Sequence, residues 1–246
     1  MSESIQKPAL TYRVTVGNNR ELKYEFRESE DGIKLVKPRH QTTETWMALS
    51  HNQCDNCPLN PVTHSICPVA ENLSVLMYDW QNIISFDETV LEVESKQRTI
   101  SATTTAQKVL SSLLGLVIAT SDCPHTQFFR PMAQFHLPLA NSEETTFRAI
   151  STHLITQFFR QQNGETVNFD LQGLTDVYNK MHTVNICLKQ RIESAVENDA
   201  ALNAVVLLDI FAITLPNYLD DELEKLKPFF SILLSSPNTL IQPQIL

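Results

Sequence analysis

The sequence predicts an α+β fold in which a small antiparallel sheet region packs on a mainly α-helical bundle. Two observations lead to this prediction. Residues 1–103 contain short segments in which apolar and polar side chains alternate, as they do on a half-buried strand. From residue 104 onward, apolar residues recur every three or four positions, as on one face of a helix. We therefore expect an α+β region with a cysteine-rich metal-binding loop at 1–103 and a helical bundle at 104–246, packed together through Cys123.

Strands are predicted in two places along the first region. Residues 10–16 (LTYRVTV) and 21–26 (ELKYEF) each place their apolar side chains on one face, and the turn sequence GNNR separates them. We expect this meander to end near IKLV. Residues 89–95 (TVLEVES) and 98–103 (RTISAT) predict a second hairpin. Between the two places, the segment PVAENLSVLMYDW, which begins at Pro68, has the apolar spacing of a helix.

Two helices are predicted at the start of the bundle. The first should cover roughly 105–120. The second should begin at Asn141, because Glu144 follows three residues later and completes a capping box. This second helix is expected to turn one apolar face inward. The residues of that face are Phe147, Ile150, Leu154, Ile155 and Phe158.

Three more helices are expected in the second half of the bundle. A long helix should follow Asp170, and an apolar helix should cover 200–215. The last segment, LDDELEKLKPFFSILL, is expected to break at Pro228, because an interior proline removes a hydrogen bond and clashes with the preceding turn. Its charged cluster DDELEK is expected to face solvent.

Composition excludes several classes of function. The chain has 246 residues, 42% of them hydrophobic and 19% charged, which is typical of a globular protein. Its net charge is −9 and no dense basic run occurs, so non-specific nucleic-acid binding is not expected. With only five glycines, the chain contains no GxGxxG, GxxxxGK[ST] or GxSxG motif. Nucleotide-binding α/β folds and nucleophile-elbow hydrolases therefore lack support.

No membrane span or secretion signal is expected. The N-terminus has no charged segment followed by an apolar one. The apolar stretches at 109–119 and 200–216 both fall short of the about 20 residues that a spanning helix needs. We expect a cytoplasmic protein, in which thiols stay reduced. The five cysteines then indicate metal or catalytic chemistry more than a disulfide framework.

The segment HNQCDNCPLNPVTHSICPVAENL, residues 51–73, predicts a metal site. Cys54 and Cys57 form a CxxC pair, and Cys67 follows after nine residues. Thiolates are the preferred ligands of Zn²⁺ and of iron–sulfur clusters. Cys67 also precedes Pro68 at the expected start of a helix, where the positive end of the helix favours thiolate over thiol.

Three thiolates leave one ligand position to fill. The candidates are His51, His64, Cys123, His125 and His136. Cys123 is favoured, because it lies just beyond a helix end and repeats the Cys-Pro dipeptide found at Cys57 and Cys67. His51 is second, because it would complete a compact local site. Cys187, inside the long helix, is expected to be only a small buried hydrophobic residue.

Zinc is the expected metal, because four protein ligands around a redox-silent ion make a rigid structural site. An iron–sulfur cluster is the alternative. Zinc knuckles usually follow a cysteine with small residues whose N–H groups reach sulfur, whereas prolines follow three of these four cysteines. Cys-Pro steps are familiar around iron–sulfur clusters.

Asp209 stands in the apolar string VVLLDIFAI, where a buried carboxylate is costly unless it is paired. An internal ion pair or hydrogen bond is therefore expected. The partners considered are Arg148, His153, His182 and Arg191. The alternative is a functional acid in a cavity of the bundle, with His182 and Asn185 nearby.

Four strings carry a family resemblance: CDNCPL, CPVAENL, TSDCPHTQFFRPMAQFHLP and LNAVVLLDIFA. They resemble an uncharacterised bacterial family that is known only as a domain of unknown function. The resemblance covers the chain from about residue 45 to 215 and includes all four proposed ligands. It implies a bacterial, soluble protein and brings no activity, substrate or cofactor.

These observations predict a non-catalytic cytoplasmic metal-binding protein. Its four-cysteine site, Cys54, Cys57, Cys67 and Cys123, would act as a structural staple for an interaction or regulatory module whose partner is another protein. The alternative is an iron–sulfur redox protein or sensor. A weaker alternative is a zinc-dependent hydrolase-like enzyme with an open metal position and an acid such as Asp209 or Glu71.

Overall fold

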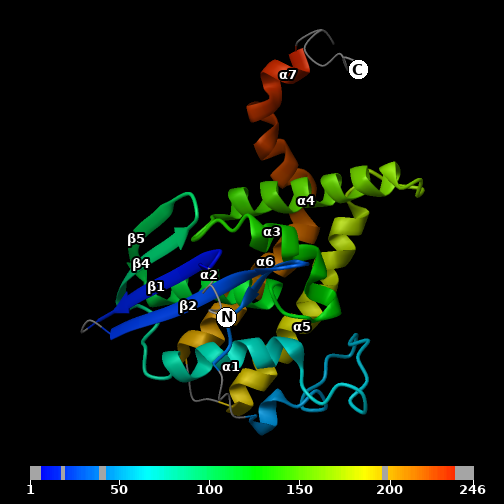
Figure 1. Ribbon diagram of the computed structural model, residues 1–246. Coiled ribbons are helices and arrows are strands. Elements are labelled where there is room, and N and C mark those ends of the chain that lie inside the picture. Colours follow the sequence, from blue (N-terminus) through cyan, green and yellow to red (C-terminus); the bar gives the residue numbers. More distant parts are fainter. Residues whose placement is uncertain (1–6, 18–19, 39–42, 196–198, 236–246) are drawn as a thin grey trace, which may run out of the picture.

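The computed structural model describes residues 7–17, 20–38, 43–195 and 199–235 and confirms the α+β class (Figure 1). Within these residues the strands form one five-stranded antiparallel sheet in the order β3-β2-β1-β4-β5. The two places where strands were predicted are therefore joined, because β1 pairs with both β2 and β4. The strands are β1 (Leu10–Val16), β2 (Arg20–Ser29), β3 (Gly32–Leu35), β4 (Glu88–Ser95) and β5 (Thr99–Thr105).

Of the described helices, the 3-10 helix η1 (Thr45–Met47) and the α-helix α1 (Pro68–Trp80) lie between β3 and β4 in the chain, and the others follow β5. The other α-helices are α2 (Ala106–Ala119), α3 (Arg130–Gln134), α4 (Ser142–Gln162), α5 (Gln172–Ala195), α6 (Asp199–Leu226) and α7 (Ser231–Ser235). The other short 3-10 helices are η2 (Pro124–Phe129) and η3 (Lys227–Phe230). Among these helices, none is both long and apolar enough to cross a membrane.

One face of the sheet is the core face, as the alternating pattern predicts. Val14 of β1 is fully buried and stands between Leu22 of β2 and Leu91 of β4. Helices α1 and α2 cover this face, and Trp80 Nε1 of α1 donates a hydrogen bond to Tyr24 Oη of β2 at 2.9 Å. The same buried cluster continues into α5 and α6, so the sheet and the bundle share one core.

The last helical segments differ from the expectation. The apolar helix expected at 200–215 continues through Pro216 to Leu226, so it forms one 28-residue helix with the acidic segment. The break expected at Pro228 is present, because the α-helix ends at Leu226 and a 3-10 turn follows. A single long helix therefore links the core of the bundle to the C-terminal end of the described chain.

Helix α4 begins as predicted but turns a different face inward. Asn141 Oδ1 accepts a hydrogen bond from Glu144 N at 2.8 Å, and Asn141 N donates to Glu144 Oε2 at 2.9 Å, which completes the capping box. Of the expected inward face, Ile150 alone is buried. Phe147, Leu154, Ile155 and Phe158 are exposed. The prediction of this face was wrong.

The reason is the close approach of α4 to α5. His153 is buried, and its Nε2 lies 2.9 Å from the carbonyl oxygen of Asp170. A Cβ atom at Gly173 would stand only 3.1 Å from His153 Cε1, so glycine allows the two helices to approach this closely. The polar and small residues of α4 therefore make the inner contact, and its large apolar residues point outward.

A buried polar contact ties the segment after α3 to the sheet. Tyr12 Oη is hydrogen-bonded to His136 Nε2 and also lies 3.3 Å from Ser112 Oγ of α2. Burial, and then the positive charge of Arg148, lower the pKa of His136 to about 3. His136 therefore stays neutral in the folded protein under conditions where the imidazole of an unfolded chain becomes charged.

This contact predicts a loss of stability in acid. As the pH falls from 6.5 toward 3, the unfolded chain binds a proton at His136 that the folded protein does not bind. The free energy of unfolding should then fall by up to about 1.4 kcal/mol per pH unit from this group. Denaturant unfolding of the wild type and His136→Gln between pH 7 and 5 measures it. The variant should show a shallower pH dependence, whereas the exposed-site control His64→Gln should match the wild type. Equal slopes for His136→Gln and the wild type would contradict the assignment.

Candidate metal centre

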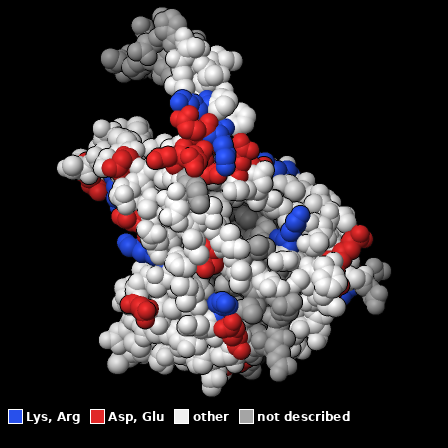
Figure 2. Space-filling view, turned by 180° about the vertical axis from the view of Figure 1, so that it is seen from behind, with Lys and Arg blue, Asp and Glu red and all other residues white. Residues whose placement is uncertain are grey.

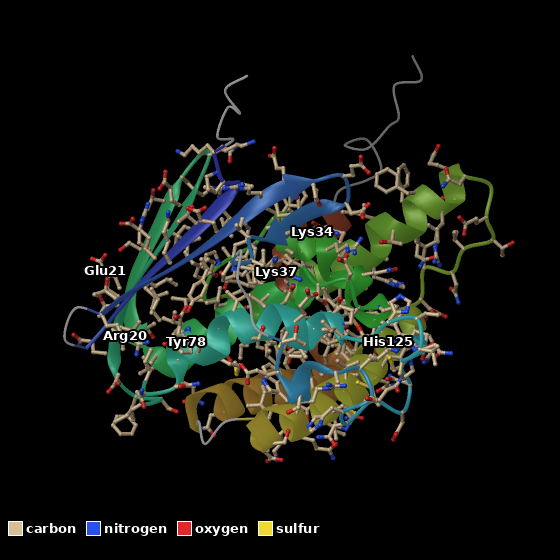
Figure 3. The ribbon with its side chains drawn as sticks, turned by 60° about the horizontal axis from the view of Figure 1, so that its bottom comes forward. Arg20, Glu21, Lys34, Lys37, Tyr78 and His125 are labelled. Carbon is tan, nitrogen blue, oxygen red and sulfur yellow. The ribbon has the colours of Figure 1, made fainter. Side chains whose placement is uncertain are left out.

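The four cysteines predicted as ligands line one small cavity of about 20 Å³. Cys54 and Cys57 come from the loop between η1 and α1, Cys67 directly precedes α1, and Cys123 directly precedes η2. Figure 3 shows His125 of η2 beside the cyan loop that carries the first cysteines. The structure therefore brings residues that lie far apart in the chain to one place.

Local backbone structure explains how the thiols converge. Cys57 N donates to Cys54 O at 2.9 Å, which closes the CxxC turn. Cys67 N donates to Met47 O at 2.8 Å, which holds the end of the loop against η1. Cys67 and Cys123 both have extended backbone, and each is followed by a proline in the first turn of a helix. The repeated Cys-Pro dipeptide therefore marks two helix starts that meet at the cavity.

Two opposing effects act on the Cys123 thiol. Burial, and then the neighbouring Cys67 and Cys57, raise the pKa of Cys123, the backbone N–H groups of His125 and Thr126 lower it, and the net result is a pKa of about 11. A bound cation would offset both burial and repulsion between the thiolates.

Cys187 belongs to the same cluster, which the sequence did not reveal. It is buried, as expected, but it is not isolated. Burial, and then the charge and hydrogen bond of the neighbouring Cys187, raise the pKa of Cys54. The long helix α5 therefore contributes a fifth thiol next to the four that line the cavity.

Arg191 of α5 also lines the cavity and is 1% exposed. Its Nη1 donates to the carbonyl oxygens of Trp46 and Ala48 at 2.8 Å, and its Nη2 donates to that of Leu49 at 3.0 Å. Among the described residues it has no carboxylate partner, and its Nε atom has no hydrogen-bond partner. A buried guanidinium without a counter-charge is unfavourable. Four thiolates around a divalent ion carry a net charge of about −2, which would supply that counter-charge.

Sequence reasoning considered Arg191 only as a partner of Asp209. A stronger signal was present in the helical spacing of α5. Val184, Leu188 and Arg191 follow one another at intervals of four and three residues, so the arginine stands on the same buried stripe as the apolar residues. A charged residue on such a stripe indicates a buried polar or ionic contact.

The other candidates for the fourth ligand lie in different surroundings. His125 lines the cavity, but its Nε2 lies 2.7 Å from the carbonyl oxygen of Asn56, so this nitrogen donates and is not free to bind a metal. The remaining candidate histidines have other partners: His51 Nε2 lies 2.8 Å from Ser194 Oγ, His64 Nδ1 lies 2.9 Å from Thr63 Oγ1, and His136 Nε2 is hydrogen-bonded to Tyr12 Oη.

Asp209 has one of the four partners considered for it. His182 Nδ1 lies 2.8 Å from Asp209 Oδ1, and both side chains are partly exposed. Glu71, the other acid considered, pairs with Lys37 at 2.7 Å. Neither acid lines the cysteine cavity. The acids proposed for a hydrolase-like enzyme therefore do not lie beside the thiols.

The thiols line the same cavity but do not have the geometry of a metal coordination site. Among the described residues, no group of three or more His, Cys, Asp or Glu side chains has the geometry to hold a metal ion. The four cysteines share a cavity wall, and all of them are free thiols, as is the neighbouring Cys187. Coordination of an ion by the four cysteines stays a prediction.

A family model described as a domain of unknown function, DUF6901, matches residues 10–231. This match confirms the resemblance to an uncharacterised domain family and extends it over both the sheet and the bundle. Searches of curated proteins and of solved structures find no match.

Proposed function

We propose that this chain, which belongs to the DUF6901 family, binds one zinc ion through Cys54, Cys57, Cys67 and Cys123 in the cytoplasm. The ion would act as a structural staple in a non-catalytic interaction or regulatory module. The convergence of these four thiols on one cavity, beside the buried guanidinium of Arg191, is the observation that supports the proposal most strongly.

The size of the cavity favours a single ion. A cavity of about 20 Å³ accommodates roughly one water-sized particle. A single zinc ion therefore fits the cavity as it stands, and we prefer zinc to the iron–sulfur alternative. Leu49, Val69 and Leu188 complete the wall with apolar side chains. Such a wall suits a closed structural site and leaves little space for a catalytic water.

Binding of the ion requires a local change that the side chains allow. The thiols must lose protons, because thiolates are the ligands of zinc. The sulfur of Cys54, which lies near Cys187 as well as near Cys67 and Cys123, must also come within bonding distance of the ion. Both changes involve side chains on a loop and at two helix starts, and the core can stay in place.

The staple would hold a loop that has little regular structure of its own. Between η1 and α1 the chain forms turns and one isolated bridge, Ala48 with Ile66. An ion shared by Cys54, Cys57 and Cys67 would fix this loop, and Cys123 would attach it to the end of α2. The loop exposes Val62, which is 91% accessible, on a surface that a partner protein could contact.

Metal analysis of freshly purified protein tests the proposal. We expect about one zinc per chain, no colour, and a lower melting temperature after removal of the ion by a strong chelator. Brown protein containing iron and acid-labile sulfide would support the cluster alternative instead. Protein that contains no metal, and whose melting temperature does not change when zinc is added, would contradict both.

A further inference from the structure

The C-terminal arm, residues 227–235, extends away from the rest of the described structure (Figure 1). It exposes large apolar side chains within six residues. They are Phe229 at 72%, Phe230 at 40%, Leu233 at 54% and Leu234 at 68% exposure. Figure 2 shows a band of charged side chains at the base of the arm and an uncharged surface beyond it. An apolar surface of this kind marks an interaction site.

Helix α4 carries a second exposed apolar surface, which we call the α4 face. It consists of Phe147, Leu154, Ile155, Phe158 and Phe159, each between 37% and 61% exposed. At about 100° per residue these side chains lie mainly on the side of the helix away from its buried residues, so α4 presents an apolar stripe to solvent. An exposed apolar stripe of this kind is normally covered by a partner. The rings of Phe158 and Phe159 contact each other edge to face at 5.8 Å and extend the surface.

Helix α4 packs against α6, and the arm that follows α6 extends outward from the end of the molecule where α4 lies (Figure 1). Lys225, near the base of the arm, is close enough to Glu143 at the start of α4 for their charges to interact. The arm then continues outward, and the α4 face stays exposed within the same chain. The exposed arm of one molecule could therefore pack on the exposed α4 face of a second molecule, and the reverse.

We propose that a second copy of this chain covers both surfaces, with the C-terminal arm of each copy packed on the α4 face of the other. A two-fold axis relates the two copies, so the contact of the first arm with the second face is repeated as the contact of the second arm with the first face. A free aromatic side chain offers about 200 Å². The five phenylalanines of the two surfaces, about half exposed, therefore offer roughly 500 Å² per copy, and the four Leu and Ile side chains bring the total toward the about 800 Å² per partner of a stable standard interface.

The charged side chains around the interface fit this arrangement. At the base of the arm, Lys227 Nζ lies 2.9 Å from Glu224 Oε1, and Lys225 pairs with Glu222. These ion pairs form within one chain, so dimerisation need not leave any of these four charges without a partner. They form a polar rim around an apolar centre, as in many protein interfaces.

Light scattering on the full chain after size-exclusion chromatography tests the proposal at micromolar concentration. The wild type should have twice the chain mass of 27.9 kDa. An arm variant, Leu233→Glu with Leu234→Glu, and a face variant, Ile155→Glu with Phe159→Glu, should each be monomeric with unchanged circular dichroism. The control Phe86→Glu, at an exposed apolar side chain near the start of β4, should remain dimeric.

Mixing the two variants gives the sharpest result. The arm variant still has an intact face and the face variant an intact arm, so an equimolar mixture should form heterodimers through one intact contact. Their affinity should be lower than that of the wild-type dimer. A monomeric wild type would overturn the proposal. A face variant that dimerises like the wild type would also overturn it, because it would indicate pairing of arm with arm. A monomeric protein that sediments with lipid vesicles through the arm would overturn it as well.

Discussion

Cys123→Ser should lose the bound zinc and lower the free energy of unfolding by about 4 kcal/mol, the stabilisation expected when free metal exceeds its dissociation constant a thousandfold. Serine keeps the size of the side chain but supplies no thiolate. The proposed staple attaches the loop of Cys54, Cys57 and Cys67 to the end of α2 through this sulfur. Its loss should therefore also raise the protease sensitivity of the loop between η1 and α1. Metal content and chemical unfolding, measured on the same preparation, give both results.

Two controls separate metal binding from the burial of a thiol. Chelator should lower the melting temperature of the wild type and leave that of Cys123→Ser unchanged, because the variant has no ion to lose. Cys187→Ser removes a buried thiol that is not a proposed ligand, so it should keep one zinc per chain. If Cys123→Ser retains its metal and its stability, Cys123 is not a ligand, and the staple between loop and bundle is wrong.

Arg191→Met should lower the free energy of unfolding by about 3 kcal/mol even without metal, because it removes the side-chain donor to the buried carbonyl groups of Trp46 and Leu49. Methionine fills much of the same space but cannot donate to Trp46, Ala48 and Leu49. It also removes the positive charge beside the thiols, so the affinity for zinc should fall about 10- to 100-fold, as for other residues that support metal ligands. Competition with a chelator of known affinity measures the second effect.

Lys189→Met is the matched control, since it removes a positive charge from the same helix at a position that is exposed. It should change neither stability nor zinc affinity by a measurable amount. If Arg191→Met loses stability but binds zinc as tightly as the wild type, the guanidinium holds the η1 segment and does not balance the charge of the site.

Much of the fold could be predicted because it depends on short-range patterns. The alternation in LTYRVTV and ELKYEF places Tyr12, Val14 and Leu22 on the core face of adjacent strands. The capping pair of Asn141 and Glu144 begins α4 as expected. These signals lie within a few residues of one another, so no knowledge of distant neighbours is needed to interpret them.

The expected inner face of α4 and the end of α6 could not be predicted in the same way. Periodicity identified the largest apolar residues of α4, but the contact of His153 with Gly173 determined which side faces α5. Likewise, Pro216 lies inside α6 without ending it. Both outcomes depend on packing against distant parts of the chain, which local spacing does not contain.

The candidate site shows the same division. Cys67 and Cys123 could be associated because each precedes a proline at a helix start, which is a local signal. The contact between Cys54 and Cys187, and the bonds of Arg191 to the η1 segment, join α5 to residues more than a hundred positions earlier. No pattern in the sequence specifies those contacts, although the position of Arg191 on a buried stripe indicated that it has a partner.

X-ray absorption spectroscopy at the zinc edge is the most direct measurement of the central claim, that four sulfurs meet on one ion. For the purified wild-type protein we expect a single shell of four sulfur atoms at about 2.3 Å, with no nitrogen or oxygen ligand. Cys123→Ser should show fewer than four sulfurs or no bound zinc. A wild-type shell dominated by nitrogen or oxygen, or the absence of zinc from protein prepared in its presence, would contradict the account.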